Sequence, residues 1–205
     1  MGTRNLTCVF IDGEYKVAQY CQWDGYPAGQ GATILHFLRD EANWITFTKR
    51  LKEISWINPE KLKRIFLSYG GSEEGFISCE NHDKLKQGFP EFHRDTGAKI
   101  LKMIQNNETT TGMLQNSIEF AAQSDCEWCY VVDIDKGTFE VYKGLNFEPL
   151  TPEDRFYFLR NQEDNWEYKG LKTHGVKLLK SYSLDNLPTD IQFINDCDPP
   201  EKEDE

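Results

Sequence analysis

The sequence has no long apolar run and comparatively little positive charge. No stretch approaches the roughly 20 apolar residues that a membrane-spanning helix needs, and the N-terminus lacks the apolar segment of a secretion signal. Lys and Arg number 23 against 34 Asp and Glu, which gives a formal net charge of −11. This charge disfavours binding to nucleic acid and to anionic membrane surfaces. We therefore expect a cytoplasmic protein that binds neither.

Familiar catalytic and nucleotide-binding signatures are also missing. No serine lies in a nucleophile-elbow sequence, and the four histidines are isolated along the chain. The glycine-rich stretch 25–31 lacks both the Lys and the Ser or Thr that complete a P-loop, and it does not have the spacing of a dinucleotide fingerprint. The sequence therefore offers no support for a hydrolase triad, and we predict no cofactor.

Cysteine is present but is not arranged for chemistry. We expect the six cysteines to be reduced thiols, most of them in the core. Cys126 and Cys129 form a CxxC pair, and Cys79 with His82 could supply two further zinc ligands. The pair lies between a predicted helix and the following strand, where extended backbone would point its thiols to opposite sides. We therefore predict buried thiols and no metal site.

The chain is long enough for one good core and too short for two. We predict a single α+β domain over residues 1–195, followed by a disordered acidic tail over 196–205. That tail has almost no apolar side chain to bury, and its acidic residues repel one another.

Two β-hairpins organise the predicted fold. Strands over 6–11 and 15–21 are joined by Asp12-Gly13, the favoured dipeptide of a type I′ turn. Pairing Ile11 with Glu14 predicts one face made of Leu6, Cys8, Phe10, Tyr15, Val17 and Cys21, and another made of Thr7, Val9, Ile11, Ala18 and Tyr20. Both faces are largely apolar, so we expect a sheet covered on both sides.

A second hairpin is predicted over 129–134 and 138–143, around Asp135-Lys136-Gly137. We expect it to share the core of the first hairpin. Its acidic residues Asp133, Asp135 and Glu140 are typical of a solvated hairpin.

The remaining segments predict helices that cover the sheet. Helical patterns run over 32–40, 44–57, 91–106 and 111–124, with a short helix from the Asn58-Pro59 cap through 64. We expect a strand over 65–69, an irregular segment over 72–90, a capped helix start over 151–154, and one or two strands within 166–182. The fold class is therefore α+β, with layered sheets built from antiparallel hairpins and covered by helices.

The loop over residues 22–31 holds the densest group of functional side chains. A glycine-rich loop between a strand and a helix leaves backbone N–H groups beside the positive end of the helix dipole. Trp23 and Tyr26 add stacking surfaces, Asp24 adds a charge, and Gln30 adds hydrogen-bonding groups. The predicted ligand-binding residues are Arg4, Gln22, Trp23, Gly25, Tyr26, Gly29, Gln30 and Gly31. The alternative is that the glycines merely permit tight turning and helix packing.

Two family resemblances are visible in these motifs. The opening Gly-Thr-Arg-Asn-Leu over 2–6, the loop over 22–31 and the second hairpin resemble a family of proteins from bacteria, phages and filamentous fungi that has no established activity. This resemblance implies a shared fold.

The chain also distantly resembles the N-terminal-nucleophile amidohydrolases, which place an Asp-bearing turn after the second strand of an N-terminal hairpin. Asp24 occupies that turn. The resemblance implies an αββα sandwich, with Thr3 as the nucleophile and Asp24 as the residue that orients it. Removal of Met1 exposes Gly2, which has no nucleophilic side chain, so Thr3 would need a further cleavage.

These observations lead to three hypotheses about function. The leading one is a domain that binds a small polar molecule or a peptide end at the loop over 22–31, with amide-hydrolase ancestry as one origin. The second is a non-catalytic module whose aromatic loop and acidic tail bind another protein. The third is an active amidohydrolase that uses Thr3 and Asp24 after N-terminal processing.

Overall fold

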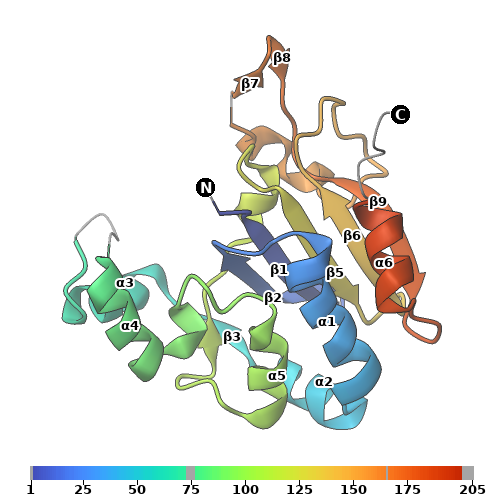
Figure 1. Cartoon of the computed structure of the whole chain (residues 1–205). Helices are drawn as coiled ribbons and strands as arrows, with labels where there is room; N and C mark the ends of the chain where they lie inside the picture. The colour runs from blue at the N-terminus through green and yellow to red at the C-terminus, as the bar shows by residue number, and fades with distance from the viewer. Residues whose placement is uncertain (1, 73–76, 165, 200–205) are drawn as a thin grey trace.

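The computed structural model describes residues 2–72, 77–164 and 166–199. Its centre is a five-stranded mixed sheet in the order β2-β1-β5-β6-β9 (Figure 1). The strands are β1 (Asn5–Ile11), β2 (Glu14–Cys21), β5 (Trp128–Asp133), β6 (Thr138–Lys143) and β9 (Lys177–Ser183). With helices packed on this sheet, the predicted α+β class is confirmed.

The first hairpin has the predicted turn but contains a bulge. Asp12 and Gly13 have φ values of 54° and 79°, as a type I′ turn requires, and Ile11 pairs with Glu14. Val9 then pairs with Val17 while Phe10 pairs with Tyr15, so Lys16 is an extra residue in β2.

This bulge reverses the predicted faces of the rest of β2. An inserted residue moves every later side chain to the other side of the sheet. The predicted faces are therefore wrong for Val17, Ala18, Tyr20 and Cys21. Val17 lies with Val9, whereas Ala18 lies opposite Cys8.

Parallel pairing of β1 with β5 joins the two hairpins in one sheet, as predicted. The turns of the two hairpins are also linked, because the Asp135 carboxylate accepts hydrogen bonds from the N–H groups of Asp12 (2.9 Å) and Gly13 (2.8 Å). The second turn covers residues 134–137, and Gly137 in it has a φ of 67°.

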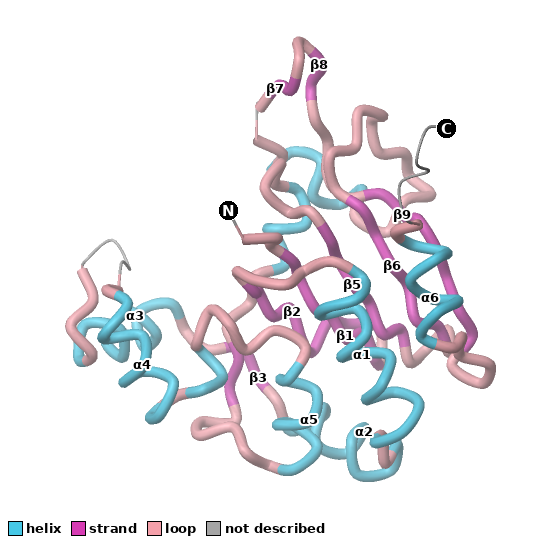
Figure 2. Tube along the Cα trace, in the orientation of Figure 1, coloured by secondary structure: helices cyan, strands magenta, loops and turns pink. Residues whose placement is uncertain are grey.

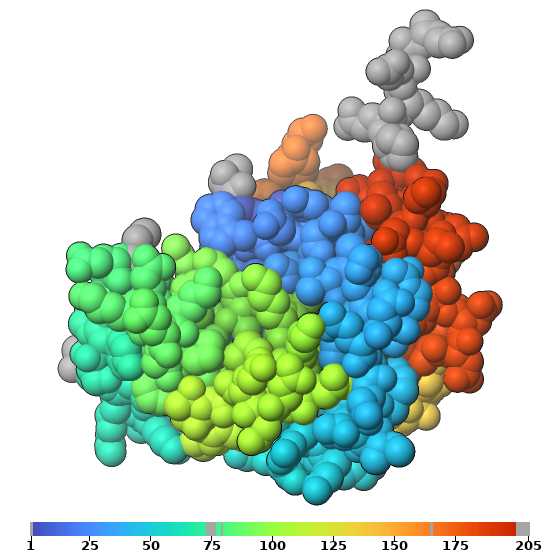
Figure 3. Space-filling model, turned by 60° about the horizontal axis from the view of Figure 1, so that its bottom comes forward, coloured from blue at the N-terminus to red at the C-terminus, as the bar shows by residue number. Residues whose placement is uncertain are grey.

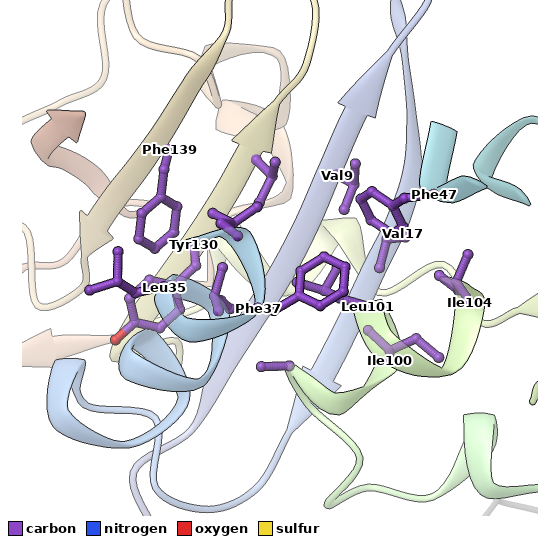
Figure 4. Packing of buried hydrophobic residues seen from close by; sticks show 14 of the residues in the cluster. Val9, Val17, Leu35, Phe37, Phe47, Ile100, Leu101, Ile104, Tyr130 and Phe139 are labelled. Carbon is purple, nitrogen blue, oxygen red and sulfur yellow. The ribbon is translucent and has the colours of Figure 1, made fainter. Parts of the chain in front are cut away.

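Helices cover one face of the sheet (Figure 2). α1 (Ala32–His36) continues from the π-helical turn η1 (Pro27–Gly31) into a second one, η2 (Phe37–Glu41), and α2 (Trp44–Glu53), α5 (Lys99–Asn106) and α6 (Asp190–Cys197) lie beside this segment. The core between helices and sheet contains Val9, Val17, Leu35, Phe37, Phe47, Leu101, Tyr130 and Phe139 (Figure 4).

Short helices and loops cover the other face. The 3₁₀ helices η4 (Ile118–Ala122) and η5 (Tyr157–Gln162) pack there against Leu6, Cys8 and Val131. The sheet is thus buried on both sides, as predicted. An αββα sandwich needs a second large sheet on this face, whereas the other sheets of the described residues have two strands each: β3 (Ser55–Trp56) with β4 (Met113–Leu114), and β7 (Glu167–Tyr168) with β8 (Leu171–Lys172).

Several local predictions are wrong. α3 (Pro59–Ser68) begins at the predicted Asn58 cap, whose side chain accepts from Glu60 N at 2.9 Å, but it continues through the predicted strand over 65–69. α4 (Cys79–Gly88) lies in the segment predicted to be irregular. α2 ends at Glu53, before the predicted end at 57, because the next residues pair with β4.

Two further predicted helices are shorter than expected. The 91–106 segment forms only the 3₁₀ turn η3 (Pro90–Phe92) and α5, and 111–124 forms β4 and η4. Residues 151–154 form a turn in which the Asp154 carboxylate accepts from Thr151 N (2.7 Å), and the next helix, η5, begins at Tyr157.

The C-terminal helix extends past the predicted start of the tail. α6 begins with a capping box at Thr189 and Gln192 and runs through Cys197, two residues beyond the expected boundary at 195. Cys197 is buried in the core beside Tyr182, and the Asp196 carboxylate binds Lys180 Nζ at 3.0 Å. The rest of the predicted tail, from 200 to 205, lies outside the described residues.

A buried ion network lies on the face covered by η4 and η5. Arg155 Nε donates to Glu140 Oε2 (2.7 Å), and its Nη2 contacts Asp133, while Tyr142 Oη donates to the same Glu140 oxygen (2.6 Å). Burial favours the neutral form of Arg155, but the bonds to Glu140 and Asp133 outweigh it and raise the pKa of the guanidinium. Asp133 and Glu140 are therefore buried acids paired with one cation, not the solvated residues predicted.

We predict that Arg155→Ala strongly destabilises the protein. It leaves two buried carboxylates without their cation, which typically costs about 3–5 kcal/mol. Urea denaturation at pH 7 measures the free energy of unfolding. The control is Arg160→Ala, because Arg160 is exposed and lies over the Tyr157 ring at 4.3 Å, a contact worth about 0.5–1 kcal/mol. Equal small losses in the two variants would contradict a structural role for the network.

Candidate functional site

The loop over 22–31 is held together by its own backbone. Gly25 N donates to Thr3 O (2.9 Å), Gly29 N to Tyr26 O (2.9 Å) and Gln30 N to Asp24 O (2.8 Å). A Cβ on Gly29 would lie 2.2 Å from Asp24 O, and one on Gly25 would lie 2.6 Å from Thr3 O. Glycine is therefore required for close backbone approach. The N–H groups of Gly29 and Gln30, which were predicted to face a ligand, are bonded inside the loop.

Several predicted ligand-binding residues make contacts within the protein. Gln30 Oε1 accepts from Ala98 N (2.8 Å), which ties the loop to the start of α5. Tyr130 Oη donates to Gly25 O (2.7 Å), and Gly31 lies against the rings of Phe193 and Tyr130. Trp23, Asp24 and Tyr26 remain exposed.

The structure brings Thr3 beside the turn that carries Asp24, through the bond between Thr3 O and Gly25 N. Asp24 has a left-handed φ of 55°, and the hydrogen bond of its carboxylate is a long one from Tyr26 Oη (3.4 Å). Arg4 is paired with Asp125, with Nη2 and Oδ1 2.9 Å apart. Met1 lies outside the described residues.

A cleft of about 550 Å³ lies next to this loop, at the β2 edge of the sheet. α3 and α4, which lie beyond that edge, contribute Phe66 and His82 (Figure 1). The bond from Gln22 N to Arg94 O (3.0 Å) joins the predicted loop to the cleft. We call it the β2-edge cleft, and its lining residues are Gln19, Tyr20, Phe66, His82, Phe92, His93, Arg94, Gln115, Asn116, Ser117, Glu119, Phe120 and Gln123.

Two histidines that are isolated in the sequence meet in this cleft. The ring centroids of His82 and His93 are 5.4 Å apart, edge to face. His93 is 4% exposed, and its Nδ1 accepts from Asp95 N (3.2 Å), so the proton of the neutral ring is on Nε2. Burial lowers the pKa of both rings; the Arg94 charge also lowers that of His82, while Asp95 acts in the opposite direction. Both rings are therefore neutral at pH 7.

Buried polar atoms without hydrogen-bond partners gather around the cleft. They include Gln19 Oε1, His82 Nδ1 and Arg94 Nε of its lining, and the adjacent Asp95 Oδ1. Arg94 Nε and Asp95 Oδ1 are 3.8 Å apart, too far for a hydrogen bond. Asn5 and Thr7, fully buried on β1, also have unpartnered side-chain atoms, and Thr7 lies opposite Gln19. Such groups are rare and costly in folded proteins, where bound water or another polar partner normally satisfies them.

A second groove, of about 560 Å³, lies between α1 and α5 on the face seen in Figure 3. Its lining combines small or apolar residues, including Ala28, Ala32 and Met103, with charged ones, of which Lys102 and Glu41 are paired at 3.0 Å. None of its described lining residues has a buried polar side-chain atom without a partner. The β2-edge cleft is therefore the stronger candidate site.

The CxxC thiols are core residues. Cys126 and Cys129 are buried in the core on the η4 side of the sheet, and burial raises the pKa of both thiols. Within the ranges that the structure describes, no three His, Cys, Asp or Glu side chains are grouped to hold a metal ion. Nor does that part of the chain include a helix with the length and apolar character needed to cross a membrane.

Comparisons with protein-family models, with curated proteins and with solved structures gave no match.

We predict that Asp24 matters for its backbone conformation rather than its charge. Asn adopts a left-handed conformation readily, whereas Ala pays about 1–2 kcal/mol for it. Asp24→Asn should therefore change the free energy of unfolding by less than about 0.5 kcal/mol, and Asp24→Ala should lower it by about 1 kcal/mol. Urea denaturation of both variants measures this. A loss above about 1 kcal/mol in Asp24→Asn would instead show that the carboxylate holds the loop.

We also predict that His82 and His93 titrate below the ordinary value of 6.5. The unfolded chain then takes up protons before the folded one as the pH falls. The contribution of these rings to stability is complete above pH 6.5 and is lost as the pH falls from there toward the folded pKa. Histidine ring NMR measures the midpoints, with the four signals assigned by single His→Gln variants. Midpoints at or above 6.5 for both cleft rings would contradict the burial argument.

Proposed function

We propose that this protein is a binding domain for a small polar ligand and that the β2-edge cleft is its site. The observation that carries the proposal is the group of buried, unpartnered polar atoms on Gln19, His82 and Arg94 in the wall of one cleft. These atoms are enclosed, so a ligand reaches them when the side chains turn toward the cleft, and the bonds that it then supplies remove the cost of leaving the atoms unpaired.

The chemistry of the cleft suits a ligand with both polar and apolar parts. Its polar groups include the Arg94 guanidinium and the His93 Nε2–H, and side-chain amides are contributed by Gln19, Gln115 and Asn116. The rings of Tyr20 and Phe120, 4.9 Å apart and edge to face, provide apolar wall. A few polar groups set among aromatic side chains are typical of small-molecule sites, and the volume lies in their usual range.

This proposal keeps the predicted class of ligand and moves the site. The glycine-rich loop supports the cleft from one side through the Gln22–Arg94 bond, and Gln30 holds Ala98 beyond it. The loop therefore fixes the position of the segment that carries His93 and Arg94.

Histidine ring NMR provides the test. The chain has four histidines, of which His82 and His93 line the cleft, while His36 and His174 are paired elsewhere with Asp190 and Glu163. A panel of acetate, acetamide, inorganic phosphate and N-acetylated amino acids is titrated at constant pH. At least one compound should shift the His82 and His93 signals saturably and leave the other two in place. A panel that moves no cleft signal, or moves all four together, would contradict the proposal.

A further inference from the structure

The edge of β2 is covered at two points and open between them. Ala18 O accepts from Ser117 N (3.1 Å), and Gln22 N donates to Arg94 O (3.0 Å). Alternate residues of a strand direct their backbone groups to the same side, so the N–H and C=O of Tyr20 face outward between these two bonds. Within the described chain no backbone group of a neighbouring segment bonds to them, and the Tyr20 carbonyl accepts one long hydrogen bond, from Gln19 Nε2 at 3.4 Å. Tyr20 is part of the cleft lining. The cleft therefore contains one position of the sheet edge that has no backbone partner in the described chain, and we call it the open rung.

The spacing of the two covering bonds limits what can pair with that rung. Residues 18 and 22 of an extended strand are about 13 Å apart at ~3.3 Å per residue. A peptide strand running along the edge would collide with the segments that carry Ser117 and Arg94. The open rung therefore accepts a single amide unit, such as an acylated amino acid or the last residue of a chain.

The positive charge of Arg94 next to the open rung favours an amide unit that carries a carboxylate. Arg94 is the cation of the cleft lining. Within the described chain its ion-pair partner is Asp95, and the contact is a long one, with Arg94 Nε and Asp95 Oδ1 3.8 Å apart. The Nε2–H of His93 is a second donor on the residue before it. Glu119, the acidic lining residue, is exposed, so solvent screens its charge. A guanidinium with an adjacent N–H donor is suited to a carboxylate.

We propose that the β2-edge cleft binds a short amide compound that ends in a carboxylate: an N-acyl amino acid or the carboxyl-terminal residue of a peptide. The amide pairs with the Tyr20 peptide, the carboxylate binds Arg94 and His93, and an apolar side chain packs on Tyr20, Phe92 and Phe120. This inference rests on the proposed function and specifies its ligand.

The test uses four compounds on the full-length protein, followed by the His82 and His93 ring signals. N-acetylphenylalanine has the amide, the carboxylate and the ring. N-acetylphenylalanine amide lacks the carboxylate, 3-phenylpropionate lacks the amide, and inorganic phosphate supplies charge alone. N-acetylphenylalanine should bind at least 10-fold more tightly than any of the other three. A heptapeptide ending in phenylalanine distinguishes a free N-acyl amino acid from the end of a peptide chain. Its affinity should equal that of N-acetylphenylalanine only if the cleft accepts a chain end.

Variants of the protein add a second readout. Arg94→Gln should lower the affinity for N-acetylphenylalanine at least 10-fold and leave the affinity for N-acetylphenylalanine amide unchanged. The control Arg160→Gln should alter neither affinity. Equal affinity for N-acetylphenylalanine and 3-phenylpropionate would overturn the role of the open rung. Binding of phosphate but not of N-acetylphenylalanine would overturn the ligand class and leave the proposed function standing. Failure of every compound, on a wild-type protein shown to be folded, would remove both.

Discussion

The parallel pairing of β1 with β5 is the contact on which the rest of the structure depends. Each hairpin alone is a two-stranded ribbon, which is marginal in water. Their union makes a four-stranded unit with two apolar faces, to which β9 adds an edge. Arg4 O and the Asp135 carboxylate fasten the two ends of this junction, although the bonded residues are more than a hundred positions apart in the chain. The helices on one face and the short 3₁₀ segments on the other have a surface to pack on only because the junction forms.

The features that could be predicted from the sequence are those set by interactions between residues close together in the chain. The Asp12-Gly13 turn, the Asn58 cap and the second hairpin depend on neighbouring residues, and each is found where the pattern indicates. The Lys16 bulge has no strong local signal, so the predicted faces of β2 were inverted beyond it. β3 and β4 are each two residues long and exist because they pair with one another. The helical periodicity of these segments does not predict that pairing.

The candidate site was harder to predict for the same reason. Its histidines come from α4 and from the segment before α5, and its amides come from β2 and from the residues on either side of η4. No spacing along the chain signals that these parts meet. The glycine-rich loop was conspicuous because glycine marks close backbone approach, and that approach turned out to be to Thr3 and Asp24 within the protein itself. Arg155 likewise gave no sequence signal as the partner of Asp133 and Glu140.

The two bonds that cover the β2 edge also have a consequence for how copies of this protein behave toward one another. An unpaired strand edge is a template on which another molecule can add a strand, and proteins that leave such edges open tend to aggregate. Ser117 and Arg94 interrupt this edge with backbone bonds from segments that are not strands. At the opposite edge, β9 carries Lys177 and Lys180, and charged side chains of this kind discourage strand addition. The β2 edge is thereby protected against growth from one molecule into the next, whereas the β9 edge relies on these lysines alone beside the exposed Leu178 and Leu179.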